Sequence, residues 1–432
     1  MLSGDNGVLQ KATDAKIQTG IGQEKETIAL AYNSALAKKM GTGNSTSVTA
    51  EDLNVELTNQ GATADGNNPI TVTFTESQNA YTIDSNGNID KSIPPEPIIA
   101  GAKVRDSKGN KVASNNVDLV DDYGNKITIP KGFKIAEGTN VADGIVIEDY
   151  NVETKATKGN QFVWVPVGSS IKKSETETVE IKLGRYTFNS SNGTPTLVQE
   201  ASKTNYTTAT ALNSNYYEYD ATNTTYGNEK AKSLGTFISN TIDNGGYYIA
   251  RYESGISGTV DQWTLAEGYS QNSDSQYVAK NNSKVLAKDG SVKPIIKAGF
   301  GIWNGVTQQE ASTISRNMYS NINSDLINSY AWDTAIIFIQ KCGVNSSSYS
   351  IKKDGNGSLK TTGSNSDEQC HINDMAGNVQ EWSTETCGIS STIPCVLRGA
   401  YYIHAYIGPE TRSSNPQGWP GIYTGFRVIL YI

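Results

Sequence analysis

A proline-rich segment divides this 432-residue sequence into two unequal parts. Residues 92–97 read SIPPEP, and prolines spaced this closely can continue neither a helix nor an inner β-strand. Such a segment is typical of a stiff linker between folded units. The sequence therefore predicts a small N-terminal unit at 1–93 and a larger unit at 94–432.

The N-terminal part predicts helices followed by a small antiparallel sheet. A second, short helix is expected at 50–57, and the β-rich runs at 70–75 and 80–83 are typical of a hairpin sheet. The first and longer helix is expected at 12–39, where apolar residues recur at the spacing of one helix face, namely Ile17, Ile21, Ile28, Ala31, Tyr32 and Ala35.

The larger part combines many short strands with two helices, so we expect an α+β fold. A capping-box pattern from Thr307 to Glu310 opens one helix, and another is expected at 325–341, before Gly343. Residues 169–233 are rich in Thr, Asn, Ser and Tyr and predict an insertion or a surface loop layer. The β-rich runs lie at 126–130, 144–147, 161–166, 247–252 and 425–430.

The charge balance makes two classes of partner unsuitable. Lys and Arg number 36 against 44 Asp and Glu, a formal net charge of -8, whereas binding nucleic acid or an acidic membrane requires a basic surface. The sequence also has no apolar run of about 18 residues, the length that spans a bilayer. We therefore expect no nucleic-acid partner, and membrane attachment only through an anchor that this sequence does not contain.

Sequence motifs for common enzymatic chemistry are missing. No G-x-x-x-x-G-K-[ST] phosphate loop and no G-x-S-x-G nucleophile elbow occurs. The alternating polar residues at 84–90 mimic a calcium loop, but the glycine stands at the fourth place instead of the sixth, which indicates a tight turn. Function must therefore be sought in other residues.

Several ordered motifs together resemble one known family. The head carries HINDMAGNVQEW at 371–382, RGA at 398–400 and GFRV at 425–428, preceded by FVWVP at 162–166 and GYYIARYE at 246–253. This set closely resembles the formylglycine-generating-enzyme, or sulfatase-modifying-factor, domain, a variant of the C-type lectin fold. The resemblance covers most of 94–432 and implies a C-type-lectin-like head.

The same resemblance implies a calcium site, so calcium is the one cofactor that the sequence suggests, although none is required. A hard cation of this kind prefers carboxylate and main-chain oxygens. The alternative is that Glu381 forms a structural ion pair with Arg398 or Arg427. Arg398, Arg412 and Arg427 are each expected to form ion pairs of the scaffold. The positions that surround calcium in enzymes of this family correspond here to Asp374, Gly377, Val379 and Glu381.

The resemblance does not extend to the catalytic groups of the family. Its enzymes use two neighbouring cysteines after the RGA motif, and residues 401–412, YYIHAYIGPETR, contain none. A related branch binds iron through a histidine cluster, which His371 and His404 are too widely separated to form. We therefore expect no enzymatic activity, and a formylglycine-generating or non-haem-iron enzyme is the rival hypothesis.

The four cysteines lie close together in the sequence, without a C-x-x-C pair. Cys370 precedes and Cys395 follows the turn at 374–382, so we expect them on strands that return past each other and form a disulfide. Such a bridge closes a loop of about 25 residues, stabilises the fold by about 3 kcal/mol and implies an oxidising compartment. The alternative is that all four are buried free thiols, at Cys342, Cys370, Cys387 and Cys395.

The N-terminus resembles a second kind of protein. LSGDNGVL at 2–9, followed by a charged amphipathic helix, looks like the segment just after the membrane helix of Gram-positive pilin-like proteins. The resemblance covers about the first 93 residues. It implies a pilin-like stem, other pilin-like subunits as partners and a cell-surface or extracellular location. The alternative is an N-terminal helical cap on the larger unit.

The segment at 401–423, here called the tip, has the composition of a binding loop. Tyr, Trp, Asn and Ser provide contact area and adaptable hydrogen bonds at low entropic cost. The tip also resembles the variable region of proteins diversified by bacterial and phage retroelements, although its aromatics are alternatively explained as strand core. The ligand-binding residues expected here are Tyr401, Tyr402, Ile403, His404, Tyr406, Ile407, Ser414, Asn415, Gln417, Trp419, Ile422 and Tyr423.

Taken with the resemblances, these features predict a non-catalytic, surface-displayed ligand-binding protein. It would be a retroelement-diversified variable protein on a pilin-like stem. Its ligand would be a protein or a glycan on another cell or on a phage. Besides the enzyme, the remaining alternative is a structural pilus subunit or an adhesin of fixed specificity.

Overall fold

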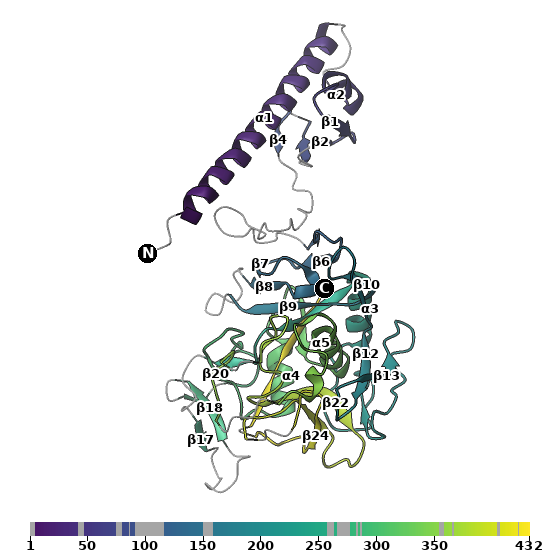
Figure 1. Ribbon diagram of the computed structural model, residues 1–432, viewed down its shortest axis with the longest axis vertical. Helices are drawn as coiled ribbons and strands as arrows, with labels where there is room; N and C mark the ends of the chain where they lie inside the picture. Colours follow the sequence, from purple (N-terminus) through teal and green to yellow (C-terminus); the bar gives the residue numbers. More distant parts are fainter. Residues whose placement is uncertain are drawn as a thin grey trace. The chain divides into compact units, whose positions relative to one another are not determined.

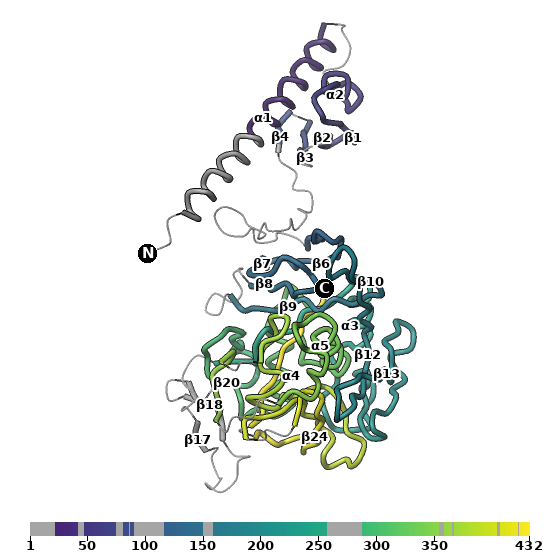
Figure 2. The backbone as a smooth tube through the Cα atoms, in the orientation of Figure 1, coloured from purple at the N-terminus to yellow at the C-terminus, as the bar shows by residue number. Residues whose placement is uncertain are grey.

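The chain divides into two compact units, 1–96 and 97–432, which are considered separately here (Figures 1 and 2). No helix among the described residues is long and apolar enough to cross a membrane. The boundary expected after residue 93 lies outside the described ranges. This computed structural model describes residues 5–41, 47–74, 80–85, 87–90, 116–149, 159–256, 263–265, 277–281, 284–285, 287–353, 358–364, 367–403, 407–421 and 423–432.

The N-terminal unit contains two helices and a four-stranded antiparallel sheet. Helix α1 spans Asp5–Gly41 and α2 spans Ala50–Glu56, where the Thr49 hydroxyl accepts a hydrogen bond from the Asp52 amide. Both predicted helices and the predicted hairpin are therefore confirmed, whereas the first strand was not predicted. The strands, in sheet order, are β1 (Ala62–Asp65), β2 (Ile70–Phe74), β3 (Ala80–Ile83) and β4 (Ile89–Asp90).

Alternation along β2 gives this unit its core. Ile70, Val72 and Phe74 are buried, and the threonines between them are half-buried. Since successive side chains of a strand point to opposite faces, only one face of the sheet supplies the core. Ile28 of α1 and Leu53 of α2 belong to the same buried cluster.

The head is organised around a six-stranded sheet whose two faces are both covered. Trp164 and Tyr248 belong to one core cluster, while their strand neighbours Val163 and Tyr247 belong to another. This explains why these strands read as continuous apolar runs. In sheet order they are β21 (Asn323–Leu326), β26 (Val428–Tyr431), β15 (Gly246–Ala250), β9 (Gln161–Pro166), β8 (Val146–Asp149) and β7 (Phe133–Glu137).

Three helices lie against the sheets of the head, and each begins at a side-chain cap. The predicted capping box of α4 (Gln308–Arg316) is confirmed. The side chain of Thr307 accepts a hydrogen bond from the backbone amide of Glu310, and the side chain of Glu310 accepts one from the amide of Thr307. Helix α3 (Leu234–Asn244), capped by Ser233, was not predicted. Helix α5 (Ser329–Cys342) contacts β9, β12 and β22 and lies in the interior of the head (Figure 1).

The helix predicted at 325–341 begins later than expected. Asp325 is part of β21 and pairs with Ile429 of β26, so it takes a place in the six-stranded sheet. The side chain of Asn328 then accepts a hydrogen bond from the Ala331 amide and starts α5. Strand pairing thus overrides the helical pattern over the first residues of this segment.

A second, five-stranded sheet carries the tip. Strand β25 pairs in parallel with β22, and the other pairs are antiparallel. The predicted run at 425–430 is divided between the two large sheets at Arg427, whose side chain is buried. The five strands are β14 (Tyr216–Tyr217), β22 (Gln380–Cys387), β23 (Cys395–Arg398), β24 (Arg412–Asn415) and β25 (Thr424–Phe426).

The remaining strands form small hairpins and short sheets, several of them within the segment expected as an insertion at 169–233. Together with the sheets and helices above, they confirm the α+β class. These strands are β5 (Val117–Val120), β6 (Lys126–Ile129), β10 (Gly168–Lys172), β11 (Thr178–Ile181), β12 (Gly184–Phe188), β13 (Pro195–Glu200), β16 (Gly255–Ile256), β17 (Trp263–Leu265), β18 (Tyr277–Asn281), β19 (Lys284–Val285) and β20 (Gly301–Ile302).

Candidate ligand-binding surface

Part of the tip forms β24, which lies at one edge of the five-stranded sheet. Ser414 and Asn415 pair with Val396 and Cys395 of β23 and are half-buried. Gln417 follows in an exposed loop. Three of the expected binding residues, His404, Tyr406 and Ile422, lie outside the described residues.

The aromatic residues of the tip pack against one another. The ring centroids of Tyr401 and Tyr423 are 5.4 Å apart, and those of Tyr402 and Tyr423 are 5.6 Å apart. Trp419 meets the buried Trp382 edge-on at 6.3 Å. The four tip aromatics among the described residues are half-buried, and Trp419 packs against the core cluster that contains Trp382.

Aliphatic residues complete the tip. Ile403 keeps 47% of its surface exposed. Ile407 is half-buried. Since no described tip residue of the predicted set is fully buried, this segment offers a mixed aromatic and polar surface.

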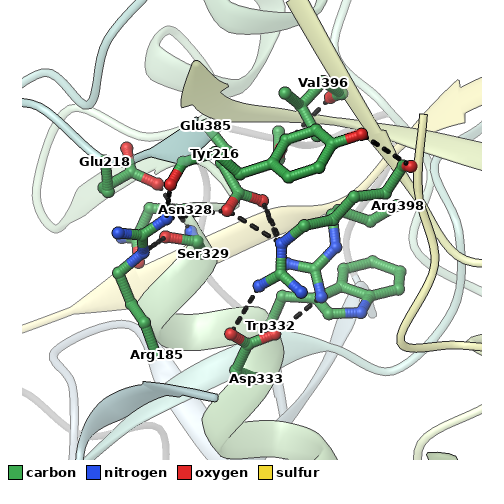
Figure 3. Close-up of polar contacts among 12 residues, drawn as sticks. Arg185, Tyr216, Glu218, Asn328, Ser329, Trp332, Asp333, Glu385, Val396 and Arg398 are labelled. Atoms are coloured by element: carbon green, nitrogen blue, oxygen red, sulfur yellow. Dashed lines mark hydrogen bonds and ion pairs between the residues drawn. The ribbon is translucent and has the colours of Figure 1, made fainter. Parts of the chain in front are cut away.

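Beneath β23 and β24 lies a buried network of charges (Figure 3). Glu385 of β22 accepts hydrogen bonds from Arg185 of β12 at 2.9 Å, from Arg412 at 2.9 and 3.0 Å and from Arg398 at 3.3 Å. Asp333 of α5 accepts from Arg398 and from Arg412, both at 2.6 Å. Two carboxylates therefore hold three guanidinium groups.

Electrostatics favour the ionised form of this network. Burial alone raises the pKa of Glu385, but the guanidinium groups of Arg412, Arg398 and Arg185 outweigh that effect and lower its pKa to about 2. The pKa of Arg412 rises above its usual range despite burial, because Asp333 and Glu385 stabilise its charge. Glu385 and Arg412 are thus charged at neutral pH.

The network also fixes the base of the tip. Arg398 ends β23 and Arg412 begins β24, and the two are directly paired in the sheet. The Arg398 guanidinium lies over the ring of Trp332, 5.4 Å from its centroid, and the Trp332 indole N–H donates to the Pro409 carbonyl at 2.8 Å. Both ends of the 399–411 connection are therefore held from below.

A further buried carboxyl, Glu218, lies beside this network. It accepts hydrogen bonds from the Ser329 amide and the Thr384 hydroxyl, both at 2.8 Å. Burial raises its pKa from the ordinary 4.5 to about 7, and the Glu385 carboxylate adds to the rise. Glu218 therefore titrates near neutral pH in the folded protein.

We expect Glu218→Gln to change the pH dependence of stability. Because the folded-state pKa is raised, the folded protein binds more protons than the unfolded chain between about pH 4.5 and 7, so wild-type stability falls as pH rises through that window. The variant lacks this decline, which amounts to roughly 3 kcal/mol at most. Urea unfolding from pH 5 to 8 measures it, and parallel wild-type and variant curves would contradict it.

The residues of the expected calcium site have other partners. Both oxygens of Glu381 accept from Arg427, at 2.6 to 3.1 Å, which is the ion pair considered as the alternative. Asp374 accepts from the Gly363 amide at 2.7 Å. The Val379 amide donates to Glu253 at 3.0 Å.

The calcium assignment stays a prediction, because the ligands expected for it include main-chain oxygens. Among the described residues, no group of three or more His, Cys, Asp or Glu side chains is arranged to hold a metal ion. Gly377, the remaining position of the expected site, is buried, as are its chain neighbours Ala376 and Asn378. We conclude that Glu381 serves as a partner of Arg427, consistent with the scaffold role of these charges.

The expected Cys370–Cys395 disulfide is not formed, and all four cysteines are free thiols. Cys395 belongs to the core cluster that contains Leu397 and Phe426. Cys370 packs against the other cluster, which contains Cys342. The prediction was wrong because the chain between the two cysteines carries them to different sides of the core.

Several residues of this region were not predicted. Arg185, Asp333 and Glu385 come from three distant segments, and the sequence contains no pattern that joins them. The tyrosines at 217, 219 and 226 were noted only as part of a polar insertion, although their density was a usable signal. In contrast, the expected scaffold roles of Arg398, Arg412 and Arg427 are confirmed by their ion pairs.

Comparisons with solved structures gave distant similarities. "Crystal Structure of CarF" has 12% identity and a TM-score of 0.29, covering 43% of this chain and 87% of that chain. "Treponema denticola variable protein 1" has 12% identity and a TM-score of 0.30, covering 66% and 99%. "Major Tropism Determinant P3c Variant" has 11% identity and a TM-score of 0.25, covering 89% and 98%. None of the curated proteins matches the sequence.

A family match covers the C-terminal part of the head. Residues 315–432 match the family described as the sulfatase-modifying factor enzyme 1-like domain. These residues include the HINDMAGNVQEW, RGA and GFRV motifs, so the resemblance drawn from them is confirmed, while the pilin-like resemblance remains a prediction. The C-terminal part of the head, from the end of α4 through β26, is therefore similar to the sulfatase-modifying factor enzyme 1-like domain.

Proposed function

We propose that this chain is a non-catalytic recognition protein whose tip binds a ligand on another cell or on a phage. The single observation that carries the proposal is the position of the tip: half-buried aromatic and polar side chains lie directly above a rigid, buried charge network. Binding surfaces benefit from such support, because side chains that are already ordered lose less entropy on binding. Ligand identity is then set by the exposed side chains.

The proposal extends to diversification and display. The set Tyr401, Tyr402, Ile403 and His404 is one that adenine-directed mutation of asparagine codons produces, which favours a retroelement-diversified tip. The charge network holds the residues on both sides of the 399–411 connection, so side chains within it can change without altering the fold. The resemblance of the N-terminal unit to pilin-like proteins supports display at the cell surface.

We also propose that the family's enzymatic activity is absent. The formylglycine-generating reaction needs a pair of cysteines after the RGA motif, and no cysteine follows Cys395 in this sequence. The thiol of Cys395 is itself buried on β23, and burial raises its pKa to about 12. A thiol in that state is a poor nucleophile and a poor metal ligand.

We expect tip substitutions to change binding without changing stability. The triple variant Ile403→Ser, Asn415→Ala, Gln417→Ala alters exposed or half-exposed positions, where single changes usually cost about 0.5 kcal/mol or less. Its Tm should stay within about 3 °C of wild type. Binding of the labelled full chain to a panel of bacterial, phage and animal-cell surfaces should weaken at least about tenfold at any surface that wild type recognises.

A matched control uses an exposed apolar residue outside the 401–423 segment. Val344 follows α5 and is 80% exposed, so Val344→Ser should keep wild-type binding and stability. Equal binding by wild type and the tip variant would contradict the proposal.

Diversification is tested in the coding DNA. The decisive observation is a near-copy of codons 398–432 that differs mainly at adenines, next to a reverse-transcriptase gene. Identical tips in related strains would contradict diversification.

A further inference from the structure

Three tyrosines from outside the tip form a stacked row, here called the tyrosine ledge. Tyr217 and Tyr219 have ring centroids 5.5 Å apart with planes inclined by 15°, and Tyr219 and Tyr226 follow at 6.0 Å and 22°. All three rings are half-buried. The ledge is therefore a nearly parallel stack of rings, each of which keeps part of its surface exposed.

The ledge borders the tip. Strand β14, which contains Tyr217, pairs with β22 and lies at the opposite edge of the sheet from β24. The Tyr216 hydroxyl donates to the Arg412 carbonyl at 3.2 Å, at the start of β24. A Cβ atom on Gly227 would lie 3.2 Å from Oε1 of Gln417, so the loop after Tyr226 touches the tip loop directly.

Buried polar contacts hold the ledge in place. The ammonium group of Lys230 donates to the carbonyls of Tyr226 and Asn228, both at 2.9 Å, and to Oδ1 of Asn228 at 2.8 Å. On the other side, a Cβ on Gly388 would come within 2.8 Å of the Tyr217 ring and 3.1 Å of the Tyr226 hydroxyl. The ledge is thus preorganised, and only glycine fits beside it.

The ledge and the last part of the tip, 413–421, carry few charged side chains. Residues 413–421 contain none, and between 216 and 227 the only charged residues are Glu218, which is buried, and Asp220. Neither 213–228 nor 413–421 contains Leu, Ile, Val or Met, and the aliphatic and charged residues of the tip lie elsewhere in it, at Ile403, Ile407, Glu410, Arg412 and Ile422. The ledge and 413–421 together therefore offer aromatic rings with hydroxyl and amide groups.

We propose that the tyrosine ledge and the adjoining tip form one binding site for a neutral carbohydrate. The C–H groups of a sugar ring carry partial positive charge and suit the negative face of an aromatic ring. The sugar hydroxyls are matched by neutral donors and acceptors on Ser414, Asn415 and Gln417. This inference rests on the proposed function, to which it adds the class of ligand and a fixed half of the site.

The test uses the full chain on an array of neutral and acidic oligosaccharides. Wild type should bind at least one neutral oligosaccharide, and Tyr219→Ala should weaken that binding at least about tenfold, since loss of a central aromatic contact typically costs that much or more. Tyr219→Phe keeps the ring and should stay within about threefold of wild type. Tyr123→Ala, in the distant β5–β6 turn, controls for loss of a half-buried tyrosine.

Three results would overturn the inference: binding confined to acidic sugars, no binding to any sugar, or equal binding by wild type and a folded Tyr219→Ala. If Tyr219→Ala does not fold, Tyr226→Phe and Gln417→Ala are compared instead. We then expect Gln417→Ala to lose sugar binding and Tyr226→Phe to keep it. If no oligosaccharide on the array binds but the protein still binds cells through its tip, the carbohydrate inference is wrong and the proposed function stands. Sugar binding that depends on Tyr219 but not on the tip rejects the proposed function and leaves the ledge as a site.

Discussion

Replacing Glu385 by Gln should destabilise the protein by about 3–5 kcal/mol, because the variant leaves three buried guanidinium groups around an uncharged amide. Glu385 accepts from Arg185, Arg398 and Arg412, and its own side chain is fully buried. Asp333 would remain as the carboxylate that accepts hydrogen bonds from Arg398 and Arg412. The free energy of unfolding in urea, measured at neutral pH, gives the loss directly.

The matched control is Glu177→Gln, on the surface of the same unit. Glu177 forms an exposed ion pair with Lys173 at 2.7 Å, and exposed pairs contribute at most about 1 kcal/mol. A loss below about 1 kcal/mol in Glu385→Gln would contradict the role given to the network. The difference in the free energy of unfolding between wild type and Glu385→Gln should shrink as the pH falls toward 2. A carboxyl with a lowered folded-state pKa stabilises the fold only while it is ionised, and protonation removes that contribution.

This network has a consequence for the tip above it. A buried ion pair is often no more stabilising than a well-packed apolar cluster, but it requires one particular arrangement of its partners. Here the requirement falls on Arg398 and Arg412, the sheet residues on either side of the 399–411 connection. The fold of the head therefore depends on these two positions more than on the side chains between them.

Periodicity predicted much of the fold because most strands are either alternating or wholly apolar. The helix at 12–39, the hairpin sheet after it and the strands at 161–166 and 247–252 all have local patterns that survive in the structure. Predictions failed where partners are distant. The beginning of the 325–341 helix became β21 because β26, about 100 residues later, pairs with it.

The candidate site was predictable only in part. The tip was found from its composition, and Arg398, Arg412 and Arg427 were expected to form scaffold ion pairs. Arg185 could not be assigned to them, because it lies 200 residues from Glu385 in the sequence. The Cys370–Cys395 pairing failed for a related reason, since closeness in sequence says little about which side of a core two residues reach.

The second large effect is expected at Arg427, where β25 passes into β26. Its guanidinium binds both oxygens of Glu381 and also donates to the carbonyls of Ala250 at 2.8 Å and Asn373 at 2.9 Å. Arg427→Met leaves Glu381 buried without its cation. It should therefore cost about 3–5 kcal/mol in the free energy of unfolding.

A double variant separates the charge from the packing. In Glu381→Gln, Arg427→Met no buried charge remains unpaired, so we expect it to recover more than half of the loss. Recovery should be incomplete, because the carbonyls of Ala250 and Asn373 still lack the donors that Arg427 supplied. A double variant no more stable than Arg427→Met would show that packing, not charge, dominates at this position.

The same variants distinguish the ion pair from the calcium site implied by the family resemblance. If Glu381 bound calcium, chelation would destabilise wild type, and added calcium would stabilise Arg427→Met by occupying the carboxylate that the arginine had left. If Glu381 has only the ion pair as its partner, each protein should unfold at the same urea concentration in calcium as in chelator.

The pH dependence of Arg427→Met gives a further check. Burial raises the pKa of Glu381, and Arg427 opposes that rise. Without the arginine, the Glu381 carboxylate should bind a proton, so Arg427→Met should regain stability as the pH is lowered toward 5.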